Sequence, residues 1–63
     1  MDDIDKKILR LLQKNARITI SDLSSEIALS MPAISERLKK LEASGVIKQY
    51  AAILDPALLN KHL

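Results

Sequence analysis

The side chains best suited to chemistry gather in residues 30–44, and their types favour binding over catalysis. This segment combines basic, acidic and small polar side chains: Ser30, Ser35, Glu36, Arg37, Lys39 and Lys40. Lysine and arginine bind phosphate, while hydroxyl and carboxylate groups can hydrogen-bond the edges of bases. The segment therefore points first to a polyanionic partner such as duplex DNA.

The spacing of this segment predicts a helix with two different faces. Ile34, Leu38 and Leu41 recur at i, i+4 and i+7, which gives one apolar face for a core. The opposite face carries Pro32, Glu36, Lys39, Lys40 and Ala43. A small, partly basic outer face is what insertion into the major groove requires.

A shorter helix is predicted just before it. Thr19 followed by Asp22 resembles a capping box, and the helix is expected to run to about Ala28. Ser30 is a good N-cap for the next helix, and Gly45 is a good stop. Residues 19–45 are thus a candidate helix-turn-helix.

The start of the shorter helix is a second candidate phosphate contact. Its open backbone N–H groups, together with the Ser21 hydroxyl, can hold a phosphate oxygen. Asp22 and Glu26 on the same helix count against this contact.

A first helix is predicted from Asp2 or Asp3 to about Lys14, with Asn15 able to stop it in a left-handed conformation. One side is apolar: Ile4, Ile8, Leu9, Leu11 and Leu12. The other side is basic: Lys6, Lys7, Arg10 and Lys14. These bases either contact phosphates or only solvate the helix. The second interpretation is favoured, because a first helix usually supports the motif from behind.

The segment after Gly45 is rich in strand formers and ends at Asp55–Pro56. A strand is predicted over 46–54, with these residues as candidates for strand pairing and dimer contacts: Val46, Ile47, Tyr50, Ala52 and Leu54. No second strand follows to form a hairpin, so the partner is expected to be a second copy or a further C-terminal segment. Residues from 56 onward can begin a short helix.

Composition narrows the function classes. The chain has 63 residues, with 10 Lys and Arg against 8 Asp and Glu, and no cysteine. Tyr50 is its one aromatic residue, which argues against single-strand binding by base stacking. An enzyme is not expected, since there is no glycine-rich phosphate loop and His62 stands without a ligand cluster. No cofactor or metal is therefore predicted. The lack of a membrane span or signal peptide predicts a soluble, intracellular protein.

The order and spacing of several short motifs resemble the DNA-binding domain of the Lrp/AsnC family, the leucine-responsive or feast/famine regulators of bacteria and archaea. The likeness covers nearly the whole chain: Asp5, Ile8-Leu9, Leu12-Gln13, Asn15-Ala16-Arg17, Leu29-Ser30, Glu36-Arg37, Leu41-Glu42, Gly45-Val46-Ile47, Tyr50 and Leu54-Asp55-Pro56. Two departures are Ala28 and Asn60, where the family commonly has glycine.

The resemblance implies a mainly α-helical fold: a three-helix, winged-helix-like helix-turn-helix domain over 1–45, then a single β-strand and a short tail over 46–63. It further implies a prokaryotic cytoplasmic regulator whose effector-binding αβ sandwich would follow the strand. This chain stops where that sandwich is expected to begin, so no small-molecule effector site is expected in it.

The leading hypothesis is sequence-preferring binding of double-stranded DNA, with a homodimer expected because half-sites come in pairs. The residues expected nearest base edges are Pro32, Ser35, Glu36 and Lys39, and those expected to contact phosphates are Ser21, Ser30, Arg37, Lys40 and Lys48. For Arg37, an intramolecular pair with a carboxylate remains a close alternative. The runner-up function is a small protein-interaction module that dimerises through 46–54 without binding DNA.

Overall fold

The computed structural model describes residues 1–62, and side chains as far as Asn60. Four helices are present in this part of the chain: α1 (Asp3–Lys14), α2 (Ile20–Ile27), α3 (Met31–Ala43) and α4 (Pro56–His62). The predicted strand and tail cover 46–63. Leu63, at the end of that tail, and the side chain of His62 lie outside the described residues. The mainly α-helical class predicted from the sequence is confirmed.

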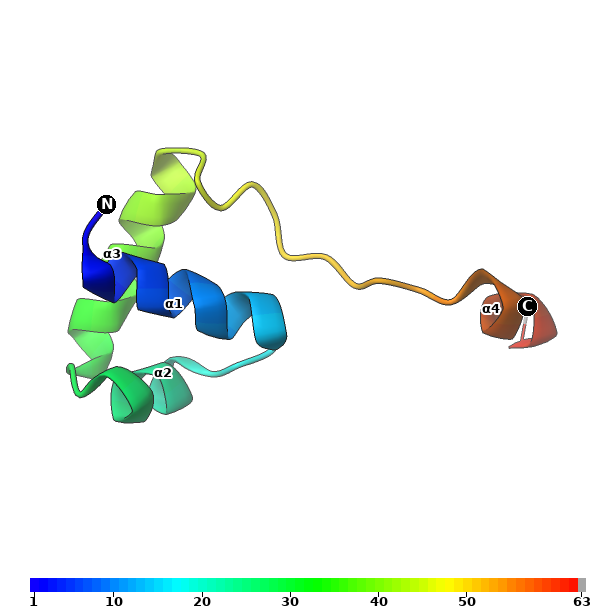
Figure 1. Cartoon of the computed structure of the whole chain (residues 1–63), viewed down its shortest axis with the longest axis horizontal. Helices are drawn as coiled ribbons and strands as arrows, with labels where there is room; N and C mark the ends of the chain where they lie inside the picture. Colours follow the sequence, from blue (N-terminus) through cyan, green and yellow to red (C-terminus); the bar gives the residue numbers. More distant parts are fainter. Residues whose placement is uncertain (63) are drawn as a thin grey trace.

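The first three helices pack around a small aliphatic core (Figure 1). Ile8 of α1, Leu23 of α2 and Ile34 of α3 are 0%, 1% and 0% exposed, and Leu41 of α3 joins them at 5%. Further aliphatic side chains pack around this centre while partly exposed: Ile4, Leu9, Leu11, Leu12, Ile18, Ile20, Ile27, Leu29, Leu38 and Ile47. The apolar stripes identified in the sequence therefore converge at one point.

Side-chain caps begin each of these three helices. The Asp2 carboxylate accepts from the Asp5 N–H at 2.8 Å, and the Thr19 hydroxyl accepts from the Asp22 N–H at 3.0 Å. Ser30 caps α3 by accepting from the Ala33 N–H at 3.3 Å. Each cap satisfies a backbone donor that the helix itself leaves open.

The turn between α2 and α3 contains a left-handed alanine. Ala28 has φ 61° and ψ 43°, and it is the one non-glycine residue with positive φ among the described residues. The Ser24 hydroxyl donates to the Leu29 carbonyl oxygen and holds this turn closed. Because a Cβ in this region contacts the following carbonyl, the turn carries local strain.

The other two helix ends differ from each other. Asn15 could stop α1 in a left-handed conformation, but its φ is −152° and its ψ is 98°, so it does not use that conformation. Its side chain instead accepts from the Arg17 N–H at 3.0 Å and forms a local turn in extended backbone. Gly45 does end α3 with a positive φ of 83°.

The predicted β-strand over 46–54 is absent in the described part of the chain. These residues carry no strand pairing: Val46 and Ile47 lie in a bend, and the chain after them leads away from the three-helix unit to α4 (Figure 1). The molecule is accordingly elongated, with extents of 43 × 24 × 17 Å. The physical reason is that a strand needs a neighbour for its N–H and C=O groups, and residues 1–62 contain no strand that could serve as one.

The short helix expected after Asp55 is present. The Asp55 carboxylate accepts from the N–H groups of Ala57 and Leu58, which caps the first turn of α4. Within residues 1–62, no helix is long and apolar enough to cross a membrane.

The strain at Ala28 gives a direct test of this turn. Ala28→Gly should raise the free energy of unfolding, by up to about 1 kcal/mol, because glycine adopts a left-handed backbone without steric cost. Ala28 is exposed, so removing its methyl group opens no cavity. Urea unfolding followed by circular dichroism measures the difference.

Gly45→Ala is the matched control. A Cβ at Gly45 would meet no atom within 4 Å, so its cost comes from the backbone alone. The free energy of unfolding of this variant should be lower by about 1 kcal/mol. A decrease in stability for Ala28→Gly would contradict the left-handed conformation at position 28.

Candidate nucleic-acid interface

The helix-turn-helix consists of α2 and α3, which pack against each other through Leu23 and Ile34. This packing turns the apolar face of α3 inward and leaves the opposite face uncovered. Pro32, Glu36 and Lys39 on that face are exposed. The structure therefore places three of the four residues predicted nearest base edges on one open surface.

Ser35, the fourth, is half-buried on the flank of this face. Lys40 is further round the helix, and its side chain is 78% exposed. Its amino group lies 3.9 Å from the Glu36 carboxylate, one helical turn earlier. An exposed ion pair of this kind contributes little to stability, so Lys40 can readily leave Glu36 for another partner.

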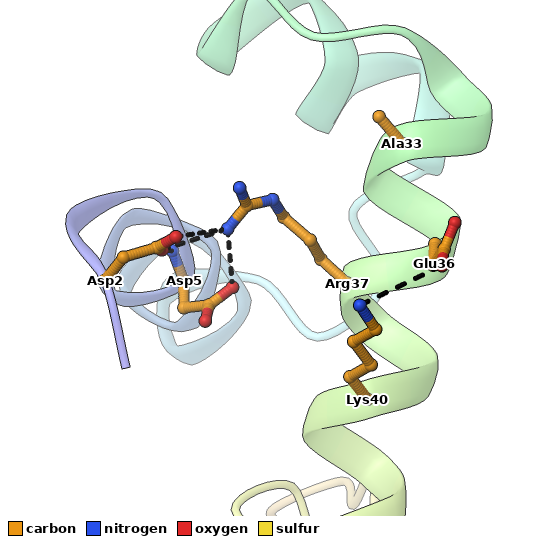
Figure 2. Close-up of a pocket in the computed structure, with 6 residues that line it drawn as sticks. All are labelled: Asp2, Asp5, Ala33, Glu36, Arg37 and Lys40. Carbon is orange, nitrogen blue, oxygen red and sulfur yellow. Dashed lines mark hydrogen bonds and ion pairs between the residues drawn. The ribbon is translucent and has the colours of Figure 1, made fainter.

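Arg37 of α3 hydrogen-bonds two carboxylates at the start of the chain. Its Nη1 donates to both carboxylate oxygens of Asp2, at 2.9 and 2.8 Å, and to Asp5 at 3.1 Å. Figure 2 shows the arginine leaving α3 and pointing to the first turn of α1. The intramolecular pair that the sequence left open for Arg37 is thus observed, and Asp2 and Asp5 are its partners.

The electrostatics of this cluster follow from its geometry. The hydrogen bond from Arg37 is the main cause that lowers the pKa of Asp2 below its ordinary 3.8, and the hydrogen bond to the Asp5 N–H acts in the same direction. The two carboxylates in turn raise the pKa of Arg37. We call Asp2, Asp5 and Arg37 the N-terminal ion cluster.

An open hollow of about 470 Å³ lies between the start of α1 and α3 (Figure 2). It is lined by Asp2, Asp5, Ala33, Glu36, Arg37 and Lys40. Three carboxylates face two bases here, so the hollow does not suit an anion such as phosphate. Lys39, on the outer face of α3, does not line this hollow.

The remaining predicted phosphate contacts are dispersed around α2 and α3. Ser21 is exposed in the first turn of α2, and Ser30 is exposed at the turn before α3. The Ser30 hydroxyl already accepts a backbone hydrogen bond, but its proton remains able to donate. Lys48 is exposed just beyond the end of α3.

The five residues predicted for strand pairing divide into two groups. Ile47 packs against the core, and its N–H donates to the Leu41 carbonyl at 3.1 Å. The other four are exposed: Val46, Tyr50, Ala52 and Leu54.

Tyr50 is tied back to α3. Its hydroxyl donates to the Glu42 carboxylate at 2.7 Å. Partial burial raises the pKa of Tyr50 to about 12, and the hydrogen bond and negative charge of Glu42 act in the same direction. The phenol is therefore protonated and able to donate at neutral pH.

The sequence pattern left open a carboxylate partner for Arg37 without identifying Asp2 and Asp5, and it missed the Tyr50–Glu42 hydrogen bond. One signal for the cluster was the i, i+3 spacing of Asp2 and Asp5, which puts two carboxylates on one side of the first turn. The described residues contain no group of three or more His, Cys, Asp or Glu side chains arranged to hold a metal ion.

Comparison with known proteins agrees with this geometry. Residues 1–48, which include α1, α2 and α3, match the family described as winged helix-turn-helix DNA-binding. The chain belongs to this family. Its helix-turn-helix is therefore that of a DNA-binding domain.

Individual relatives narrow the assignment to the Lrp/AsnC family, as the sequence motifs predict. The leucine-responsive regulatory protein of Haemophilus influenzae is 48% identical over 63 residues, which is all of this chain and 38% of that protein. The solved AsnC family transcriptional regulator from Agrobacterium tumefaciens is 40% identical with a TM-score of 0.87, and LrpC of Bacillus subtilis is 39% identical with a TM-score of 0.86.

These two structural matches cover 95% and 94% of this chain, and 39% and 42% of the two neighbours. The chain thus spans about 40% of the length of the relatives that it matches.

The N-terminal ion cluster predicts a pH-dependent contribution to stability. Arg37→Gln should lower the melting temperature at pH 7, because it leaves two carboxylates on α1 without their partner. Since the folded pKa of Asp2 is lowered, this contribution is present above pH 3.8 and is lost as the pH falls through the folded value. The difference between the two proteins should therefore shrink below about pH 4.

Lys40→Gln is the matched control, since it removes the same charge from an exposed position of α3. It should change the melting temperature little at either pH. Thermal unfolding at pH 7 and pH 3 distinguishes the two variants. Equal losses for both, or a loss for Arg37→Gln that persists at low pH, would contradict this role for the cluster.

Proposed function

We propose that this chain binds double-stranded DNA with α3 in the major groove, as the DNA-binding part of an Lrp/AsnC-type transcriptional regulator. The observation that carries the proposal is the exposed outer face of α3, held outward because α2 and α3 bury their apolar faces on each other. Membership of a DNA-binding family supports the same partner. Relatives named as transcriptional regulators support the regulatory role.

We assign base contacts to the exposed or half-buried polar and small residues of that face: Pro32, Ser35, Glu36 and Lys39. Glu36 can accept from a cytosine amino group. The proposed phosphate contacts are Ser21, Ser30, Lys40 and Lys48. Arg37 stays on Asp2 and Asp5 in this proposal and positions α1 against α3.

The proposal includes no enzymatic step, because the relatives are named as regulators of transcription. Binding to the chromosome of a prokaryote would place the protein in the cytoplasm.

The two lysines of α3 provide the main test. Lys39→Ala combined with Lys40→Ala should weaken duplex binding and reduce the salt slope of log K by about one for each phosphate that is no longer neutralised. Fluorescence anisotropy with a labelled duplex at several salt concentrations measures both quantities.

Lys6→Ala combined with Lys7→Ala is the matched control, because it removes the same charge from the exposed side of α1. This variant should keep a salt slope close to that of the unmodified chain. If both pairs had the same effect, the binding would reflect overall charge and not the outer face of α3.

We further propose that DNA binding uses a homodimer joined through 46–54. Ile53 is 100% exposed, Leu54 64% and Tyr50 50%, so this segment leaves apolar side chains in water. Its extended backbone also leaves N–H and C=O groups that a second copy can pair. A dimer would place two α3 helices on half-sites about one helical turn apart, or a multiple of that.

Sedimentation equilibrium tests the dimer. Ile53→Asp should shift the chain toward monomer by placing a charge in the proposed contact, whereas Gln49→Asp, a polar exposed position nearby, should have a smaller effect. A monomer for the unmodified chain would contradict the dimer. Self-association without DNA affinity at low salt would instead favour a protein-interaction module.

A further inference from the structure

Met31, at the start of α3, is a large apolar residue that lies outside the core. Its side chain is 48% exposed, and among the large hydrophobic side chains of α1, α2 and α3 it is the only one left exposed. Burial in the core therefore does not account for an apolar residue at this position. It lies beside Pro32, which is also exposed and apolar.

The backbone at this helix start is largely closed to phosphate. Pro32 has no N–H, and the Ala33 N–H already donates to the Ser30 hydroxyl at 3.3 Å. The Ile34 N–H donates to the Ser30 carbonyl at 3.0 Å. Only the Met31 N–H remains, so the first turn of α3 offers an apolar surface in place of an array of donors.

The apolar feature that duplex DNA presents in the major groove is the 5-methyl group of thymine. In helix-turn-helix proteins, the first residues of the recognition helix are the ones that contact base edges. Methionine suits such a contact, because its unbranched and polarisable side chain adapts to an irregular surface.

We propose that Met31 is a specificity-determining residue that packs against the 5-methyl group of a thymine, with the Pro32 ring beside it. The contact favours A·T over G·C pairs at one position of each half-site without using a hydrogen bond. This inference rests on the proposed function, since it requires α3 to lie in the major groove.

Replacement of thymine by deoxyuridine isolates the contact. The two bases differ only by the methyl group, so every hydrogen-bonding atom is kept. A duplex is first selected from a random pool by the unmodified chain, and each thymine is then replaced in turn. At one thymine of each half-site, the replacement should weaken binding about fourfold, as expected for one buried methyl group.

A double-mutant cycle then assigns the contact to Met31. Met31→Ala should weaken binding to the thymine duplex by a similar factor, and it should make binding insensitive to deoxyuridine at that same position. Met31→Leu, which keeps an apolar side chain of similar size, should retain the sensitivity. Lys39→Ala serves as the matched control: it should weaken binding and still respond to deoxyuridine.

Three results would overturn the proposal: no thymine at which deoxyuridine weakens binding, equal sensitivity in the unmodified chain and Met31→Ala, or Met31→Ala binding as tightly as the unmodified chain. In each of them duplex binding persists, so the proposed function survives. Loss of all duplex affinity in the unmodified chain at low salt would overturn both. Circular dichroism and thermal unfolding should show that the Met31 variants fold as the unmodified chain does, because the position is exposed and alanine and leucine both favour helix.

Discussion

The meeting of Ile8, Leu23 and Ile34 is the contact on which the rest of this structure depends. Each of the three helices contributes one of these side chains, and all three are at most 1% exposed. A fully buried aliphatic side chain contributes roughly 1.5–3 kcal/mol, which is a large share of the stability that a 63-residue chain can have. Because the contact fixes α2 against α3, it also determines which face of α3 is left for a partner.

Much of this arrangement could be predicted from local sequence. The i, i+4 and i+7 spacing of Ile34, Leu38 and Leu41 places the inner face of α3, and the caps Thr19 and Ser30 mark two helix starts. These predictions are correct because apolar periodicity and helix capping depend on residues only a few positions apart in the sequence. They are properties of the segment itself.

The failures mostly involve partners that are distant or lie outside the chain. Arg37 finds Asp2 across 35 residues, which no local spacing encodes. The strand formers in 46–54 express a preference that only a neighbouring strand can satisfy, so the segment stays unpaired. At the helix ends, the turn geometry requires a left-handed residue at Ala28, whereas Asn15 uses its side chain to stabilise an extended turn.

The distribution of charge shapes how such a domain can bind DNA. Arg37 is neutralised by Asp2 and Asp5, and Lys40 is loosely paired with Glu36, so the formal positive charge of α3 overstates what it offers to phosphates. Since each phosphate contact adds only a limited, salt-dependent gain, one copy with few unpaired lysines would bind weakly. A second copy would double these contacts, and an apolar contact from Met31 would add discrimination that salt does not screen. If the proposals above hold, pairing Arg37 with α1 would leave affinity to depend on a second copy, and specificity to depend on the exposed start of α3.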